Sequence, residues 1–326
     1  MALSKRLENV EFFKGKRVLV AGHTGFMGAW LSAVLNIMGA DAAGYALAPQ
    51  PGGMYEKLCG DSLIHHVAGN LLDSSLLEQT VSEFQPEIVL HLAGNGWKQD
   101  GMEEPVLTYQ TNVMGSAVLL DALRKCHSVK SIVLVSVCPP LEDYGSLIQN
   151  DGEAFCGASV YSGSKMCMEY VARDYYELYF HTESRLTGVA VVRVGNASDP
   201  SAVSDRSGQK QAGILPSDAG CTEEKTGGGR HRLQLSGSGR PVLDVLDGCL
   251  TIARLLFENP AAHAGAWEIG LGHSSGTQTD GAGIYRQREE SPQQEASQCQ
   301  SCGETERESC MREITEYYGK ARQTFG

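Results

Sequence analysis

Short apolar runs alternate with helical patterns along the first two hundred residues. The apolar runs predict buried β-strands at Val18–Ala21, Ala42–Ala46, Ile88–Ala93, Ile132–Ser136 and Val189–Val194. After the first run, Leu31, Val34, Leu35 and Met38 share one helix face, and Gly39 ends the pattern. Enough residues separate the runs for crossover helices, so we expect parallel strands. The alternation predicts an α/β fold with a doubly wound, Rossmann-type parallel sheet.

The pattern changes after residue 200. The stretch 201–240 is rich in glycine and has no long apolar run, whereas 242–256 again forms one apolar helix face, ending at Asn259-Pro260. The stretch 272–310 is polar, and 304–325 fits a final amphipathic helix. We therefore expect an NAD(P)-binding Rossmann domain over 1–200, with the 240–260 helix packing nearby. An irregular, small C-terminal substrate lobe would follow over 201–326, with 272–310 flexible.

Composition and charge narrow the class of protein. The 326 residues are 42% hydrophobic, which is enough for a sizeable core, and the formal net charge of −12 argues against a nucleic-acid partner. No apolar run approaches the roughly 18 residues that span a bilayer, and no apolar segment follows the basic residues of the N-terminus, so we expect a cytoplasmic protein without a membrane partner. Cys299, Cys302 and Cys310 have no fourth ligand near them in the sequence, so no metal site is predicted.

The first chemical signal is a glycine-rich turn. The first strand leads into Gly22-His23-Thr24-Gly25-Phe26-Met27-Gly28, which opens the following helix. Glycines permit a tight turn and close backbone approach, and a helix N-terminus attracts a pyrophosphate. The candidate cofactor-binding residues of this turn are Gly22, Thr24, Gly25, Phe26, Met27 and Gly28. The pattern Gly-x-x-Gly-x-x-Gly in this position predicts a bound dinucleotide.

Further cofactor contacts are expected at the ends of neighbouring strands. Asn70 and Leu71 follow a region, between the predicted strands Ala42–Ala46 and Ile88–Ala93, where one more strand is expected, and they are candidates to lie beside the adenine. Leu92, Ala93 and Gly94 end the next strand, where small residues let a cofactor approach the backbone. The acidic residue that usually holds the ribose of NAD is missing at the end of the second strand. The predicted cofactor is NAD, and NADP stays open.

The second chemical signal is Tyr161 followed four residues later by Lys165. Residues at this spacing share one face of a helix, and a nearby ammonium lowers the pKa of a phenol. A phenol tuned in this way can remove the proton of a substrate alcohol while hydride leaves the carbon. Ser136 ends the predicted strand Ile132–Ser136 and is a candidate to hydrogen-bond the same substrate oxygen. Tyr161, Lys165 and Ser136 are therefore the candidate catalytic residues.

These motifs resemble the extended short-chain dehydrogenases/reductases of the NAD-dependent epimerase/dehydratase family, and within it the CDP-glucose 4,6-dehydratase subfamily. The resemblance spans residues 14 to about 271. It is carried by the Gly-His-Thr-Gly-Phe turn with Trp30-Leu31 behind it, by Thr111-Asn112-Val113-Met114-Gly115 and by Tyr161-Ser162-Gly163-Ser164-Lys165. It implies a lyase of carbohydrate biosynthesis that oxidises a hexose at C4 and then assists loss of water.

The resemblance also implies roles for individual residues. Tyr161 would be the base at the 4-hydroxyl, and Lys165 would tune Tyr161 and hold the nicotinamide ribose. Asn112 matches a helix asparagine of the family, and Ser136 stands where the family has a threonine. Asn196 and Arg240 match positions near the substrate diphosphate. The substrate would be a nucleotide-diphospho-sugar, and the helices carrying Asn112 and Tyr161 would form a homodimer.

The chain departs from the family pattern directly after Ser136. The family keeps an Asp and a Lys there for the elimination of water, whereas this chain reads Val137-Cys138-Pro139-Pro140. Three alternatives stay open: a nucleotide-sugar 4,6-dehydratase with altered acid/base residues, a related 4-epimerase or 4-ketoreductase, and a catalytically impaired cofactor-binding paralogue. The oxidation step needs only the tyrosine, lysine and serine, so it is compatible with the first two alternatives.

Overall fold

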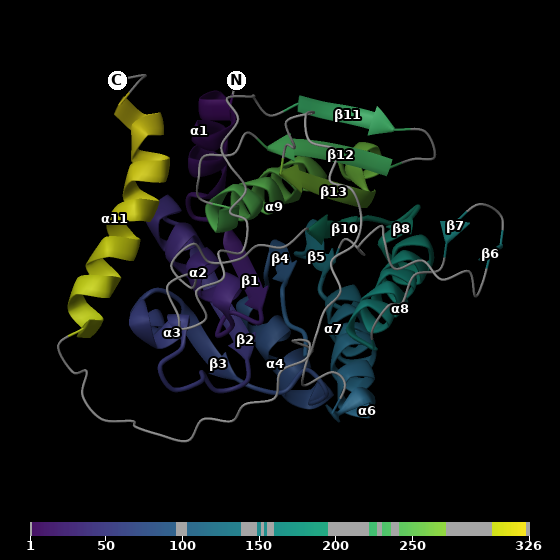
Figure 1. Ribbon diagram of the computed structural model, residues 1–326. Coiled ribbons are helices and arrows are strands. Elements are labelled where there is room, and N and C mark those ends of the chain that lie inside the picture. The colour runs from purple at the N-terminus through teal and green to yellow at the C-terminus, as the bar shows by residue number, and fades with distance from the viewer. Residues whose placement is uncertain are drawn as a thin grey trace, which may run out of the picture.

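A mostly parallel sheet runs through the molecule with helices on both faces (Figure 1). The computed structural model describes residues 2–95, 103–137, 149–150, 153–154, 160–194, 222–226, 230–235, 241–271 and 302–323. Within these residues the sheet has nine strands, in the order β11-β12-β13-β10-β5-β4-β1-β2-β3. The strands β3-β2-β1-β4-β5-β10 have the order of a Rossmann fold. The chain adds strands toward one edge from β1 to β3 and then toward the other edge from β4, so the order switches between β1 and β4. The predicted fold class is confirmed.

The five predicted strands all form, and the structure adds others. The strands of the main sheet are β1 Arg17–Ala21, β2 Asp41–Ala46, β3 His65–Ala68, β4 Ile88–His91, β5 Ser131–Val137, β10 Gly188–Val194, β11 Thr222–Thr226, β12 Arg230–Leu235 and β13 Gly265–Leu271. Two short hairpins stand apart from it: β6 Gln149–Asn150 with β7 Glu153–Ala154, and β8 His181–Thr182 with β9 Arg185–Leu186. Strand β11 is antiparallel to β12, and the other neighbours in the main sheet are parallel.

Helices cover the two faces of the sheet and build two separate cores. The helices are α1 Ala2–Phe13, α2 Phe26–Met38, α3 Met54–Lys57, η1 Gly60–Ser62, α4 Ser74–Phe84, α6 Pro105–Tyr109, η2 Gln110–Met114, α7 Gly115–Arg124, α8 Val160–Tyr175, η3 Tyr176–Phe180, α9 Pro241–Glu258, α10 Pro260–His263 and α11 Cys302–Gln323. Helices α1, α2, α9 and α11 pack on one face, and α4, α7 and α8 pack on the other (Figure 1). Val18 and Val20 of β1 face the first core, and Leu19 and Ala21 face the second, because side chains alternate along a strand.

The elements after residue 200 extend the same sheet. Helix α9 packs into the first core, and β13 pairs in parallel with β10. Helix α11 overlaps the predicted 304–325 helix but begins at Cys302, inside the segment 272–310 that was expected to be flexible. Residues 272–301 lie outside the described part of the chain. The division into a Rossmann domain and a substrate lobe at residue 200 stays a prediction.

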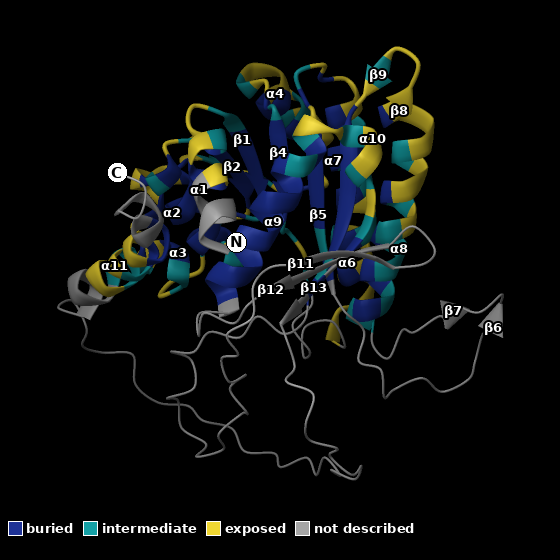
Figure 2. Cartoon of the chain, turned by 90° about the horizontal axis from the view of Figure 1, so that it is seen from above, coloured by how far each residue is buried: buried dark blue, intermediate teal, exposed yellow. Residues whose placement is uncertain are grey.

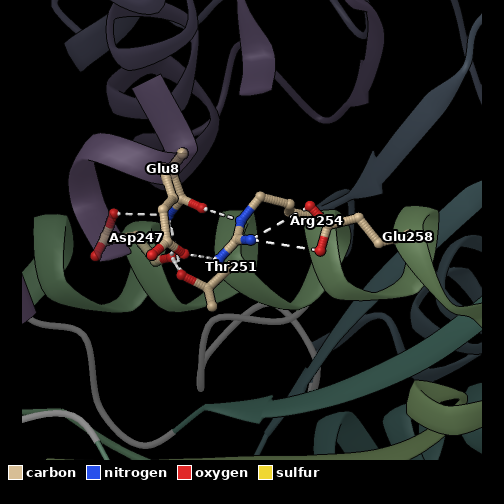
Figure 3. Close-up of polar contacts among 6 residues, drawn as sticks. Glu8, Asp247, Thr251, Arg254 and Glu258 are labelled. Atoms are coloured by element: carbon tan, nitrogen blue, oxygen red, sulfur yellow. Dashed lines mark hydrogen bonds and ion pairs between the residues drawn. The ribbon is translucent and has the colours of Figure 1, made fainter. Parts of the chain in front are cut away.

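Helix α1 was not predicted from the sequence, and a buried polar network attaches it to α9 (Figure 3). Asn9 is fully buried and donates to Asp247 Oδ1 at 3.1 Å and to Thr251 Oγ1 at 2.9 Å. Arg254 donates to Asn9 Oδ1 and forms an ion pair with Glu8 at 2.8 Å. Since these partners are about 240 residues apart in sequence, no local pattern could have revealed them.

Burial follows this layered arrangement (Figure 2). Strands β1, β4 and β5 lie in the buried centre, and the exposed residues lie on the outer faces of the helices and in the connecting loops. Among the described residues, we find no helix with the length and apolar character needed to cross a membrane. Because β1, β4 and β5 are parallel neighbours, their carboxyl ends meet at one edge of the sheet, and the candidate site lies there.

Candidate active site

Two glycines of the β1–α2 turn are required by the fold itself. Gly22 has a φ of 92°, a backbone conformation that favours glycine, and a Cβ there would lie 2.5 Å from the backbone nitrogen of Ala93. A Cβ on Gly28 would clash with the carbonyl oxygen of Gly22. Gly25 differs, because its φ is −73° and the nearest atom to an added Cβ is 3.4 Å away. The turn therefore has room for a Cβ at Gly25, at the start of α2.

The start of α2 fits the phosphates of a dinucleotide. Gly25 is the N-cap residue, and its lack of a side chain leaves the first amides of the helix without a side-chain cap. Thr24 donates its hydroxyl to the carbonyl of Leu47 at 3.0 Å, which ties the turn to the end of β2. Phe26 and Met27 pack against the first core and anchor the helix start. Glycine and threonine thus shape the turn, whereas the two apolar residues fix it.

On the adenosine side, the end of β2 carries no acid, as the sequence indicated. His23 of the turn is fully buried, and its Nε2 lies 2.6 Å from Nδ1 of His66 on β3. Burial lowers the pKa of His23 to about 4, helped by repulsion from His66. Asn70 is exposed just after β3, and its side chain accepts a hydrogen bond from the amide of Leu72 at 3.0 Å. Leu71 is buried beside it.

Lys165 lies at the centre of the site, in the second turn of α8. Its Nζ donates to the carbonyl of Val135 at 3.2 Å and to that of Ala93 at 3.4 Å. Burial lowers the pKa of Lys165 to about 8, and attraction to Glu169 opposes the shift. A Cβ on Gly94 would lie 3.0 Å from this Nζ, so glycine lets the end of β4 approach the ammonium. The lysine thus joins the carboxyl ends of β4 and β5.

Asn112 connects the chain after β4 to the first turn of α8. Its Oδ1 accepts from the Asn95 amide at 2.7 Å, and its Nδ2 donates to the Asn95 carbonyl at 2.8 Å. The same Nδ2 donates to Ser164 Oγ at 2.8 Å, and Ser164 donates to the Tyr161 carbonyl at 2.7 Å. Asn112 lies in the π-helical turn η2, a distortion that is frequent at functional sites. The asparagine thereby holds Tyr161 and the β4 loop in one unit.

His91, at the end of β4, supports this turn from inside the sheet. Its Nε2 lies 2.8 Å from Ser116 Oγ, and Ser116 donates to the carbonyl of Asn112 at 2.7 Å. Burial, together with repulsion from Lys165, lowers the pKa of His91 to about 3, so the ring is neutral. These contacts give His91 a structural role.

Tyr161 lies close to Lys165 but is not activated by it in this state. The Lys165 Nζ is 6.0 Å from the centroid of the Tyr161 ring. Burial raises the pKa of Tyr161, so the expected lowering by the ammonium was wrong for the protein alone. The physical reason is that Lys165 is directed to two backbone carbonyls, while the phenol is largely removed from water.

Ser136 forms contacts that the sequence did not reveal. Its hydroxyl lies 2.6 Å from Glu169 Oε1, and Arg193 on β10 forms an ion pair with Glu169 at 2.6 Å. Glu169 follows Lys165 by four residues and therefore extends the face of α8 that carries Tyr161 and Lys165. That spacing was a signal that could have identified Glu169 as part of the site.

The candidate residues that the structure describes fall into one continuous region. Gly22 abuts Ala93 and Leu92, and Ala93 and Gly94 contact Lys165, which lies beside Tyr161. Asn112 joins the same group, and Ser136 ends the neighbouring strand. Asn70 and Leu71 lie beyond β2, after β3. The predicted diphosphate contacts Asn196 and Arg240, and the stretch 138–140 after Ser136, lie outside the described residues.

A sheet with the strand order of a Rossmann fold, a glycine turn after β1 and Tyr161 beside the buried Lys165 are together typical of dinucleotide-binding proteins. The model of the NAD dependent epimerase/dehydratase family matches residues 18–256, and the chain belongs to this family. Its members include dehydratases and epimerases of nucleotide sugars, so the chain is related to enzymes. The resemblance inferred from the sequence motifs is confirmed.

Among the relatives, CDP-glucose 4,6-dehydratase of Salmonella typhimurium is 36% identical over 193 residues, which are 57% of this chain and 53% of the relative. UDP-glucose 4-epimerase of Yersinia pestis is 24% identical over 222 residues, covering 64% of this chain and 63% of the relative. The chain thus spans about half to two thirds of the length of these relatives. Among solved structures, the UDP-Glc/GlcNAc 4-epimerase of Campylobacter jejuni matches with a TM-score of 0.55 and 14% identity over 79% of each chain, which supports the fold alone.

Proposed function

We propose that the protein is an NAD(P)-dependent enzyme that oxidises a nucleotide-diphospho-sugar at C4 of the hexose. The observation that carries the proposal is the arrangement around Lys165, which lies beside Tyr161 and is bonded to the ends of β4 and β5. Burying a lysine costs stability, so packing alone does not favour a lysine at this position. A role in the reaction accounts for it. The similarity to a CDP-glucose 4,6-dehydratase supports a cytidine diphosphate sugar as substrate.

The glycine turn fits the cofactor of this reaction. Gly22 and Gly28 shape the backbone, and the space at Gly25 admits a diphosphate at the start of α2. Asn70 and Leu71 would flank the adenine, and Lys165 would hold the nicotinamide ribose. A bound nicotinamide supplies the hydride acceptor for the sugar carbon. NAD is the expected form.

The chain's own residues then manage one proton. Tyr161 removes the proton of the 4-hydroxyl as hydride leaves C4, and later returns it. A phenol with a raised pKa is a poor base only while protonated; once ionised, it accepts the alcohol proton readily. Lys165 favours that ionised form when it turns from the carbonyls of Ala93 and Val135 toward its ligand and Tyr161. Ser136 hydrogen-bonds the same sugar oxygen, and Asn112 keeps Tyr161 in place.

Different observations favour two different reactions after the oxidation at C4. The similarity to a 4,6-dehydratase favours loss of water across C5 and C6. The sequence after Ser136 favours a 4-epimerase or 4-ketoreductase, because valine and proline replace the residues that would move the protons. A cofactor-binding paralogue without turnover is the remaining alternative.

One incubation separates these outcomes. The protein is mixed with CDP-glucose and NAD, and the sugar products are analysed by mass spectrometry and by deuterium exchange at C4. A 4-keto-6-deoxy product identifies a dehydratase, and exchange or inversion at C4 without loss of water identifies the second class. Absence of any change with CDP-, UDP- and dTDP-glucose contradicts the proposed enzyme.

We further propose that the protein forms a homodimer through the helices that carry Asn112 and Tyr161. Three large apolar side chains on these helices are exposed: Val106 at 68%, Met114 at 55% and Tyr170 at 38%. Met114→Glu is expected to shift the protein from dimer to monomer in sedimentation velocity. Leu186→Glu, on the β8–β9 hairpin, is the control and leaves the mass unchanged. A monomeric wild-type protein contradicts the proposed dimer.

A further inference from the structure

The side chain of Tyr45 reaches from strand β2 to the loop 69–71, which follows strand β3. Tyr45 is fully buried in the second core and is the register neighbour of Val67 on β3. Its hydroxyl donates to the backbone carbonyl of Asn70 at 2.9 Å. Its own backbone carbonyl accepts from the amide of Gly22 at 2.9 Å. One residue therefore contacts both the glycine turn and the loop 69–71.

Gly69 makes room for the contact between Tyr45 and Asn70. A Cβ on Gly69 would lie 2.4 Å from both Cζ and Oη of Tyr45, so a side chain at position 69 would push the phenol away. The amide of Gly69 donates to the Ala46 carbonyl at 2.7 Å, which holds the start of the loop against β2. The reach of the Tyr45 hydroxyl to Asn70 thus depends on a glycine at position 69.

The rest of the loop is held by other contacts. Leu71 is buried and packs against the start of α7, since a Cβ on Gly115 would lie 2.9 Å from the Leu71 Cβ. The Asn70 carbonyl also accepts from the Asp73 amide at 2.9 Å, a bond within the same turn of the chain. The Tyr45 hydroxyl is the donor that connects this carbonyl to the sheet. Loss of that hydroxyl should therefore loosen Asn70 while the loop stays folded.

Filling the core does not require the Tyr45 hydroxyl, because phenylalanine would supply the same ring. A buried hydroxyl without a partner costs stability, so its bond to Asn70 offsets a cost that phenylalanine would avoid. Burial raises the pKa of Tyr45 to about 12, and repulsion from Asp73 adds to the shift. The hydroxyl thus stays a donor across the physiological pH range. Fixing the position of Asn70 is the role that these contacts support.

We propose that Tyr45 is a positioning residue for the adenine half of the cofactor, because its hydroxyl holds Asn70 where the Asn70 amide meets the edge of the base. The inference rests on the proposed function, in which Asn70 and Leu71 flank the adenine. An asparagine amide can pair with the amine and a ring nitrogen of adenine. The bond from the Leu72 amide uses only one lone pair of Asn70 Oδ1, so the side chain keeps the capacity for both contacts.

Two reduced dinucleotides test this role without turnover. NADH carries the adenine amine, and reduced nicotinamide hypoxanthine dinucleotide has a carbonyl in its place. Both are titrated by the fluorescence of the reduced nicotinamide, and the corresponding phosphorylated pair is used if the protein binds only NADPH. We expect the wild-type protein to prefer NADH by at least about fivefold. Tyr45→Phe should weaken NADH by about 2- to 10-fold, the contribution of one hydrogen bond, and leave the hypoxanthine analogue within about twofold.

Two further variants separate positioning from loss of structure. Gly69→Ala disturbs the same contact from the side of the loop and should also reduce the preference for adenine. Tyr317→Phe is the matched control, because it removes another buried tyrosine hydroxyl, one that donates to Asp244 at 2.7 Å in the first core. It should keep the full preference. Thermal unfolding reports folding, and a ratio of two affinities on one protein does not change through a loss of stability alone.

The outcomes distinguish two failures. If Tyr45→Phe keeps the full preference for NADH, or if the wild-type protein binds both dinucleotides equally, the positioning role of Tyr45 is wrong and the proposed function stands. If the wild-type protein binds neither NADH nor NADPH, the proposed cofactor-dependent function itself is wrong. A preference that falls in Tyr45→Phe and Gly69→Ala but persists in Tyr317→Phe supports the inference. Gly69→Ala decides the question if Tyr45→Phe does not fold.

Discussion

The proposed cofactor side and the proposed catalytic side of the site are built by different means. On the cofactor side, backbone sterics decide the geometry: Gly22 and Gly28 have no room for a side chain against Ala93 and the turn itself. On the catalytic side, side-chain hydrogen bonds decide it, as Lys165 and Asn112 join strand ends to helices. A steric requirement leaves a trace in the sequence as glycine spacing. A hydrogen bond between distant residues leaves none.

Loss of the Tyr161 hydroxyl is the largest expected effect and tests the catalytic side alone. Tyr161→Phe removes the proton acceptor without changing the ring, and general acid–base catalysis contributes about 100- to 10,000-fold. Turnover of CDP-glucose should fall by about 1,000-fold or more. Cofactor affinity, measured by fluorescence titration with the reduced dinucleotide, should stay within about twofold. Undiminished turnover in this variant would show that Tyr161 is not the base at the 4-hydroxyl.

A side chain at Gly22 is the matching change on the cofactor side. Gly22→Ala combines a φ of 92° with a contact of 2.5 Å to the Ala93 nitrogen, so it should cost about 3 kcal/mol of unfolding free energy. Gly15→Ala is the control, because Gly15 has a similar φ of 70° and nothing within 4 Å of an added Cβ. It should cost only about 1 kcal/mol. Equal losses in urea denaturation would show that the close approach to Ala93 does not matter.

The same contrast explains how far the sequence could be interpreted. Apolar runs predicted the central strands, and the glycine turn and Tyr161/Lys165 were found from spacing. Strand β3 was expected only as a region without bounds, because His65–Ala68 has no apolar run and its side chains are partly buried or exposed. Glu169 was missed although its spacing from Lys165 was a usable signal, whereas Arg193 was missed because its pairing with Glu169 depends on how α8 packs over β10, which only the folded protein defines. Local sequence patterns predict the strands, the helices and the glycine turn. The side-chain pairs of the proposed catalytic side join residues far apart in the sequence, so local patterns do not predict them.

Acid should lower the stability of the protein through His23, which lies behind the glycine turn. His23, behind the turn, has a folded pKa of about 4, against about 6.5 when unfolded, and it faces His66, Tyr55 and Asp61. The unfolded chain binds more protons between these values, so stability is complete above about pH 6.5 and falls as the pH drops toward 4, by up to about 3 kcal/mol. Thermal unfolding of wild type and His23→Asn from pH 7.5 to 4.5 measures this. His91, with a pKa of about 3, adds a similar acid loss that remains in the variant.

Gly25 gives the smallest effect and the sharpest separation of ligand from fold. Its φ of −73° suits any residue, and an added Cβ would meet only the Gly22 carbonyl oxygen at 3.4 Å. Gly25→Ala should therefore change the unfolding free energy by no more than about 0.5 kcal/mol. If a pyrophosphate approaches the backbone there, a methyl group intrudes on it, and dinucleotide affinity should fall by about tenfold, or about 1.4 kcal/mol. Gly15→Ala, away from the turn, should bind normally. Unchanged affinity in Gly25→Ala would mean that the open space at the start of α2 is not where the phosphates lie, even though Gly22 and Gly28 are required by the fold.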